Sequence, residues 1–228
     1  MADETPGIGS VADAMSSRGL AGKRDYVRSL EQRRDVESLA LLVECLCDES
    51  GYLRELAEAA LLRIGVSSGP ALLPLLEQGL WFSRTSAARV LGQMGYGPAA
   101  GPLLQLTDDS VETVVREAYS ALSVLGQRGA SVRVAWALYR LPPERRIERL
   151  ARLQHTDREF AERLQRLLRT EELMSQTDPD TLRDDSPLVR ASEEGVAWDR
   201  FSEPPPVRPV PPGGPSSPTT HGADAAAR

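Results

Sequence analysis

The chain has 228 residues and a formal net charge of −6, with 33 acidic side chains against 27 lysines and arginines. This acidic balance argues against general nucleic-acid binding, because proteins that bind nucleic acid usually carry a basic domain. Only 5% of the residues are aromatic, a low share that is expected when leucine and alanine fill a helical core. No apolar run resembles a signal peptide or is long enough to span a membrane, so we expect a cytoplasmic protein.

The N-terminal part divides into a polar segment and a short helix. Residues 1–22 are small, polar and acidic without a sustained period, so we expect them to be disordered. Residues 23–34 (KRDYVRSLEQRR) predict a helix with Tyr26, Val27 and Leu30 on one side. A terminal repeat needs an atypical cap with a polar outer face, and this helix fits that role. The alternative is that its basic residues form a patch that binds an anionic partner.

Residues 36–126 contain three copies of one sequence pattern. Its segments align on closing glycines 30 and 31 residues apart, namely Gly65, Gly95 and Gly126. Upstream of each glycine, small and apolar residues recur at offsets of three and four, which places them on one helix face. A second apolar helix precedes each segment, so each unit is predicted to be a helix–turn–helix. One such pair cannot bury its own apolar face, and stacking on its neighbours would complete the core.

Polar residues also recur in these units. The turn between the two helices holds Asp48, Gln78 and Asp109, and the second helix begins near Arg54, Arg84 and Arg116. The arginines could form an anion-binding row. We favour a structural ladder with the turn acids, because the guanidinium fork suits bidentate contacts to carboxylates.

These units resemble HEAT repeats, in the short form found in phycobilisome-lyase-like proteins. The matching features are the turn acid, the arginine, the Ala-x-x-Ala/Val-Leu run and the closing Ile/Met/Leu-Gly. The resemblance departs at Gln78, which replaces the acid, and at Arg116, which is displaced by one residue. It implies an all-α, right-handed α-solenoid of about four HEAT-like helix pairs. The expected boundaries are repeats at about 35–65, 66–95 and 96–126, with a divergent repeat and cap at 127–175.

The turn into the second unit's second helix, Gly79-Leu-Trp-Phe-Ser83, carries two adjacent aromatic residues. Trp81 and Phe82 occupy registers that should lie at a turn on the rim, and Tyr52 shares the register of Phe82 in the first unit. Such aromatics either tuck over the adjacent unit or face a partner. Exposed together, the three would form an anchor of the kind that protein interfaces favour.

The last helical stretch departs from the repeat. Residues 130–141 predict a helix with Trp136 in the core, residues 144–154 predict another, and a third runs from 157 to about 174 with Thr156 as its N-cap. Arginines are dense between residues 140 and 169, with acids interleaved. We favour a salt-bridged, solvated face, with a patch for an acidic partner as the alternative.

The C-terminal part is polar and proline-rich. Residues 176–202 are acidic but carry large apolar residues, notably Trp198 and Phe201, a composition typical of linear docking motifs. This segment could dock on another protein, lie back on its own helices, or have no binding role. Residues 203–228 are expected to be an extended, disordered, proline-rich tail.

No constellation of residues points to catalysis. The two histidines, His155 and His221, are expected at an inter-helix turn and in the tail, and no Cys/His ligand cluster or phosphate loop is present. Cys45 shares a leucine register and is expected in the core, whereas Cys47 is expected to be exposed. We therefore expect no catalytic residue, no metal and no cofactor.

The leading hypothesis is a non-catalytic scaffold or adaptor that binds another protein. Its candidate contact residues are Tyr52, Trp81, Phe82, Trp198 and Phe201. The resemblance implies one alternative, a lyase-type HEAT protein acting on a bilin-like chromophore or in protein modification. Nucleic-acid binding is a weaker alternative, which requires the arginines of residues 140–169 to converge on one face. The high Ala, Arg and Pro content is typical of a GC-rich bacterial genome.

Overall fold

A computed structural model describes residues 19–170, 174–175 and 184–185. In this part of the chain every regular element is a helix, and no strand is present. Several predictions lie outside the described residues: disorder at 1–18, almost all of the docking segment with Trp198 and Phe201, and the proline-rich tail at 203–228.

The helices follow the predicted pairs closely. They are α2 (Leu20–Arg33), α3 (Val36–Leu46), α4 (Gly51–Ile64), α5 (Gly69–Gln78), α6 (Trp81–Gln93), α7 (Ala100–Leu106), α8 (Glu112–Leu125), α9 (Ser131–Tyr139), α10 (Pro143–Thr156) and α11 (Arg158–Leu168). Short 3-10 turns at Val66–Ser68 and Gly97–Ala99 lead into α5 and α7. The helices α4, α6 and α8 begin at Gly51, Trp81 and Glu112, which are the positions that the glycine alignment makes equivalent.

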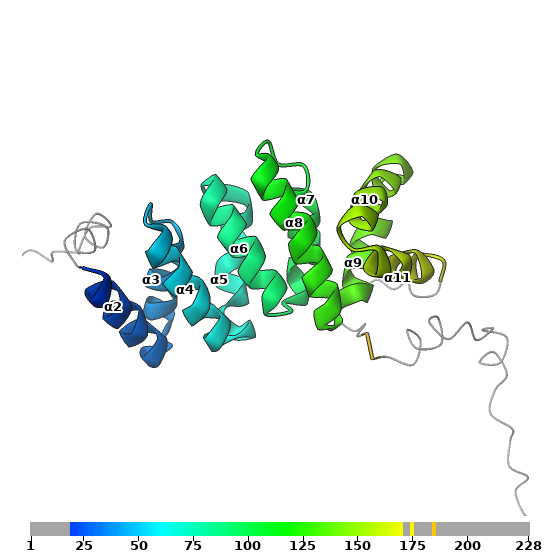
Figure 1. The fold of residues 1–228 in the computed structure, drawn as a ribbon. Helices are drawn as coiled ribbons and strands as arrows, with labels where there is room; N and C mark the ends of the chain where they lie inside the picture. The colour runs from blue at the N-terminus through cyan, green and yellow to red at the C-terminus, as the bar shows by residue number, and fades with distance from the viewer. Residues whose placement is uncertain (1–18, 171–173, 176–183, 186–228) are drawn as a thin grey trace, which may run out of the picture. The chain divides into compact units, whose positions relative to one another are not determined.

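These helices pack in two rows. In the first, α4 packs on α6 and α6 on α8, and behind it α3 packs on α5, α5 on α7 and α7 on α9 (Figure 1). The alanines eight residues before each closing glycine, Ala57, Ala87 and Ala118, are fully buried. At Gly92 of α6 the backbones of α6 and α8 lie close together. An added Cβ at this position would lie only 2.8 Å from the carbonyl oxygen of Ala121 in α8. Small side chains therefore set the spacing between α6 and α8.

The closing glycines do not all have the same role. Gly65 and Gly95 adopt positive φ angles of 83° and 71°, which fits the predicted helix ends. Gly126 has a φ of −62°, and the chain runs on through a π-helical turn at Gly126–Ala130. A Cβ at Gly126 would lie 2.0 Å from the ring of Phe160, so close packing requires this glycine. Gly126 stands at the C-cap of α8 but, unlike Gly65 and Gly95, without a positive φ.

The first helix begins earlier than predicted. α2 starts at Leu20, so the expected disorder of residues 20–22 was wrong. Val27 and Leu30 are buried, and α2 packs against α3 and α4. Arg63 of α4 donates two hydrogen bonds to the Glu31 carboxylate, at 2.6 and 2.8 Å. This pairing lowers the pKa of Glu31 from its ordinary value. The polar cap is therefore tied to the first pair by apolar packing and by a bidentate ion pair.

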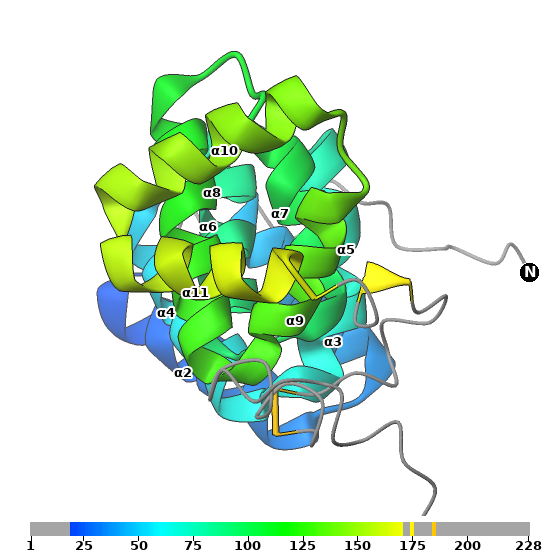
Figure 2. The same ribbon diagram turned by 90° about the vertical axis from the view of Figure 1, so that its right-hand side faces the viewer.

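The last helices turn across the end of the rows. α10 packs against α8, while α11 packs against both α9 and α10 (Figure 2). Thr156 was expected to be the N-cap of α11, but it is the last residue of α10, and Asp157 accepts the capping bond from the Phe160 N–H at 3.0 Å. Asp157 also accepts from Ser123 Oγ and from Gln127 Nε2. One carboxylate has enough lone pairs for all three donors, whereas a hydroxyl does not.

Candidate functional site

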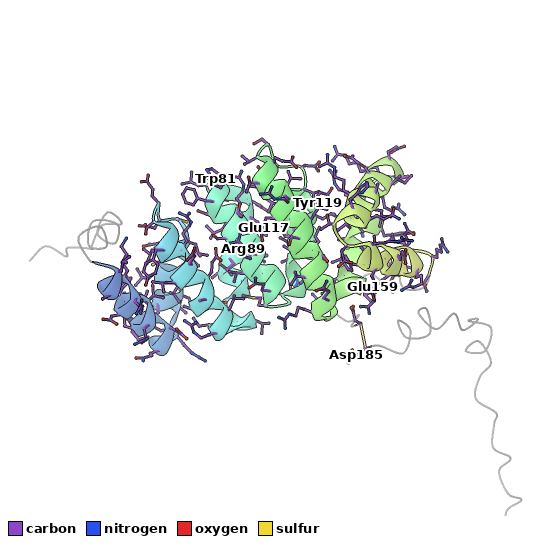
Figure 3. The ribbon with its side chains drawn as sticks, viewed as in Figure 1. Trp81, Arg89, Glu117, Tyr119, Glu159 and Asp185 are labelled. Carbon is purple, nitrogen blue, oxygen red and sulfur yellow. The ribbon has the colours of Figure 1, made fainter. Side chains whose placement is uncertain are left out.

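The turn between α5 and α6 exposes two large apolar side chains. Leu80 is 59% exposed and Trp81 is 50% exposed, at the residue before α6 and at its first residue. Trp81 stands at the end of α6 (Figure 3). Gly79 closes α5 tightly, since an added Cβ would lie 2.5 Å from the Leu75 carbonyl oxygen. Leu80 was not among the predicted contact residues, although its register immediately before the helix start marks it as a turn residue.

Phe82 fixes the position of Trp81. The two rings meet edge to face, with centroids 5.7 Å apart and planes at 82°. Phe82 is half-buried, and the guanidinium of Arg54 lies 4.7 Å from its centroid. Arg54 is itself held by the carbonyl oxygens of Asp48 and Glu49, at 2.7 and 3.1 Å. Phe82 is thus tucked against the preceding pair and supports an exposed Trp81.

Tyr52 belongs to a different contact. Its ring is half-buried, and its hydroxyl accepts a hydrogen bond from Arg24 Nη2 of α2 at 3.1 Å. The structure therefore joins Trp81 with Phe82 and places the Tyr52 hydroxyl against the N-terminal helix.

The recurring arginines mainly hold turns. Arg84 forms a bidentate pair with Asp109 of the next unit, with Nε–Oδ2 and Nη2–Oδ1 distances of 2.7 and 2.9 Å. It also donates to the Gly79 carbonyl oxygen at 2.7 Å. The equivalent partner of Arg54 in the next unit would be residue 78, which is a glutamine and not an acid. Arg54 donates instead to the backbone carbonyl oxygen of Asp48. The predicted ladder is confirmed between Arg84 and Asp109, while Arg116 is exposed.

A charged triad crosses the row of α4, α6 and α8. Arg89 lies between Glu58, at 3.2 Å, and Glu117, at 3.1 Å. Figure 3 labels Arg89 on α6 and Glu117 on the neighbouring α8. The three residues do not share a register, so the repeat pattern gave no signal for this contact. The triad stabilises the row and leaves a polar face there.

A pocket of about 440 Å³ opens between α7, α9 and α10. It is lined by Gly101, Leu104, Gln105, Asp108, Trp136, Ala137, Arg140, Leu141, Arg145 and Arg149. Trp136 was expected in the core but is only half-buried, because its ring forms part of the pocket wall under the Arg140 guanidinium, 5.0 Å from the centroid. The pocket has an apolar floor and a basic rim.

One of the three pocket arginines is part of the framework. Arg149 is 4% exposed and forms ion pairs with Asp108 and with Glu148, the latter at 3.2 Å. Arg145, in contrast, is exposed and approaches Asp108 only at 3.8 Å. Arg149 therefore fixes Asp108, and Arg145 reaches the pocket mouth.

The other arginines of residues 140–169 face in several directions. Arg158 pairs with Glu162 at 2.8 Å, and Arg146 covers the Tyr139 ring at 5.1 Å. Arg163 lies 3.4 Å from Asp184. The ion pairs of Arg158 and Arg163 on α11 fit the predicted salt-bridged face. The basic cluster of this region is the group of arginines that lines the pocket, Arg140, Arg145 and Arg149.

Asp184 lies within the predicted docking segment and contacts α9 and α11 of the same chain. Its carboxylate accepts hydrogen bonds from the backbone N–H groups of Ser131 and Val132, at 2.9 and 3.0 Å. It thereby caps the N-terminus of α9, where a negative charge is favoured. The sequence gives no sign of this contact, which joins residues more than fifty positions apart.

The described residues show no group of three or more His, Cys, Asp or Glu placed to hold a metal ion. Cys45 is buried as predicted, and burial together with nearby Asp48 and Glu44 raises the pKa of its thiol to about 12. Cys47 is exposed, also as predicted. No single helix in this part of the chain is long and apolar enough to cross a membrane, and the α4–α5 pair, apolar enough when taken together, bends by 114°.

No protein-family model matches the chain, and no curated protein matches it. The resemblance to HEAT repeats therefore rests on the residues of this chain alone.

Proposed function

We propose that this protein is a non-catalytic, cytoplasmic scaffold or adaptor, built as a right-handed HEAT-like α-solenoid of about four helix pairs. The aligned helix starts, the shared buried alanines and the row-on-row packing support this architecture. A stack of this kind holds its turn residues at fixed positions, so a partner meets a surface that is already ordered.

The observation that carries the binding role is the exposed Leu80–Trp81 pair on a braced turn. Trp81 leans on Phe82, and Phe82 lies under Arg54, which is fixed by two backbone carbonyls. Large aromatic residues dominate binding energy at protein interfaces, and an ordered one loses little freedom on binding. Truncating such an anchor typically costs about 2 kcal/mol or more, close to a thirtyfold loss of affinity.

The test compares Trp81→Ala with Val36→Ala, a matched control at another exposed apolar residue, 85% exposed. Proteins retained from the native cell by the wild-type chain would be identified, purified and titrated against each variant. We expect Trp81→Ala to weaken one partner at least about tenfold and Val36→Ala to change nothing. Equal affinities for all three chains would exclude the turn as the contact. Trp198→Ala tests the candidate contact in the tail in the same way.

The alternatives make different predictions. A lyase-type protein would carry a coloured or modified small molecule in the pocket near Trp136, and an absorption spectrum of the purified chain tests this. A nucleic-acid-binding protein would show affinity that falls steeply with salt. The dispersed contacts of Arg146, Arg158 and Arg163 disfavour that alternative.

A further inference from the structure

We infer that the pocket between α7, α9 and α10 is a second binding surface, and that it takes an acidic peptide segment. In this assignment Arg140 and Arg145 hold a carboxylate side chain, and an adjacent apolar side chain rests against Trp136. The surface is distinct from the Trp81 turn. The inference rests on the proposed binding role, but not on Trp81.

The charges of the pocket favour an anionic ligand. Three arginines line it against one acid, Asp108. Arg149 pairs with that acid from a buried position and Arg145 approaches it at 3.8 Å, while the side chains of Arg140 and Arg145 are both exposed. Among the described residues, no carboxylate lies within ion-pair distance of Arg140, whose recorded contact is the face of Trp136.

The geometry of Arg140 suits a carboxylate. A guanidinium stacked over an indole ring is held in one plane while its N–H edges remain available to an acceptor. The side chain is thus ordered before the ligand arrives, so less freedom is lost when a carboxylate binds. Arg145 adds a second cation on the neighbouring helix, at the same mouth.

The apolar lining of the pocket favours a peptide over a simple anion as the ligand. Leu104, Trp136 and Leu141 form a wall that inorganic phosphate cannot fill. A peptide with an acid next to a large apolar residue satisfies both the rim and the floor. Nucleic acid fits less well, because the exposed Glu144 and Glu148 of α10 flank the pocket arginines and the chain carries a net charge of −6.

Gly101 provides a way to close the pocket without disturbing the core. It lines the pocket from α7, and a Cβ at this position would meet no atom within 4 Å. Gly101→Phe should fill the floor, whereas Gly101→Ala should leave the pocket open. Arg140→Gln removes the rim cation, and Arg166→Gln on α11 removes an exposed arginine that does not line the pocket.

The experiment measures binding of a fluorescein-labelled peptide to the full chain by anisotropy. The probe is the sequence of residues 190–201 (RASEEGVAWDRF), which combines acids with large apolar residues. Its twin replaces Glu193, Glu194 and Asp199 by Gln, Gln and Asn. We expect the probe to bind, and the twin, Arg140→Gln and Gly101→Phe each to weaken binding at least about tenfold. Gly101→Ala, Arg166→Gln and Trp81→Ala should bind as the wild type does.

Several results would overturn the inference. They are the absence of probe binding, equal binding of the neutral twin, equal binding by Arg140→Gln, and displacement of the probe by millimolar inorganic phosphate. Tighter binding of a labelled single-stranded oligonucleotide would replace the peptide with nucleic acid. Binding of the probe only to a chain carrying Trp198→Ala would make the chain's own tail the occupant, in place of a separate partner. If Gly101→Phe does not fold, Arg140→Gln still decides the question. Normal probe binding by Trp81→Ala separates this inference from the proposed function of the turn.

Discussion

The row of α4, α6 and α8 differs from the C-terminal end of the structure in how it fills space. In the row, small residues at equivalent positions let one helix approach the next, as at Gly92 and Ala121. At the end, α11 crosses α9 and α10, and the contacts are made by residues without equivalents, such as Phe160 against Gly126 (Figure 2). The pocket beside Trp136 lies where α10 follows α9, next to this change of direction.

The same contrast applies to charge. In the row, Arg84 and Asp109 are both largely buried and form an ion pair with each other, with side chains 17% and 9% exposed. At the end, Arg149 is buried but its partner Asp108 is half-exposed, and Arg145 remains at the surface. Charges in the row therefore stabilise the fold, and part of the charge at the end remains available for binding.

The largest effect is expected from filling the closest helix contacts. Gly92→Ala should lower the free energy of unfolding by about 1–3 kcal/mol, because its Cβ meets the backbone of Ala121, which cannot move without shifting α8. Gly126→Ala should have a similar cost, through the Phe160 ring. Urea unfolding measures both. Gly101→Ala is the control and should stabilise the chain by about 0.5–1 kcal/mol. A neutral Gly92→Ala would show that the row is loosely packed.

The second comparison uses two adjacent aspartates. Asp109→Ala removes the acidic partner of Arg84 and the acceptor of the Val111 N–H, so we expect a loss of about 1–2.5 kcal/mol. Asp108→Ala should cost less, roughly 0.5–1.5 kcal/mol, because Arg149 keeps Glu148. Thermal or urea unfolding of both variants tests the order. A larger loss for Asp108→Ala would mean that the end, and not the row, depends more on its ion pairs.

Much of the row was predictable from the sequence, because its contacts repeat. The aligned glycines predicted that α4, α6 and α8 begin at equivalent positions, although these helices start one turn before Arg54, Arg84 and Arg116, and the aligned alanines predicted the buried face. The Arg84–Asp109 pair followed from the same alignment. A repeated pattern records what each unit shares with its neighbours, so it predicts the contacts that recur.

The end was predicted less well, because its contacts occur once. Nothing in the pattern indicates that Phe160 fills the space beside Gly126, or that Asp184 caps α9. Trp136 has the spacing of a core residue, yet α10 diverges and leaves its ring on a pocket wall. Thr156 is a suitable N-cap by residue type. Asp157 is the N-cap of α11 instead, and it also accepts a hydrogen bond from Ser123 of α8.

A smaller effect, dependent on pH, is expected at Asp157. Hydrogen bonds from Ser123 and the Phe160 N–H lower the pKa of this carboxyl below its ordinary value of 3.8. Its contribution to stability is therefore complete above about pH 4 and is lost as pH falls through the lowered pKa. Asp157→Ala should cost about 0.5–2 kcal/mol at pH 7, and the difference from wild type should shrink as the pH falls below the ordinary pKa of 3.8. Glu144→Ala, at an exposed residue of α10, is the control. A difference that stays constant with pH would mean that the Asp157 charge does not matter.

The smallest perturbation tests how firmly α3 is packed in the row of α3, α5, α7 and α9. Cys45 shares its register with Leu75 and Leu106, and burial raises the pKa of its thiol to about 12, whereas Cys47 is exposed at the helix end. Because only the thiolate reacts, iodoacetamide at pH 8 should modify Cys47 at least about 100-fold faster than Cys45. Mass spectrometry of the wild type and of Cys47→Ser measures this ratio, and urea should abolish it. Rapid modification of Cys45 in the folded chain would show that α3 opens readily, so that the N-terminal end resembles the divergent C-terminal end more than the row.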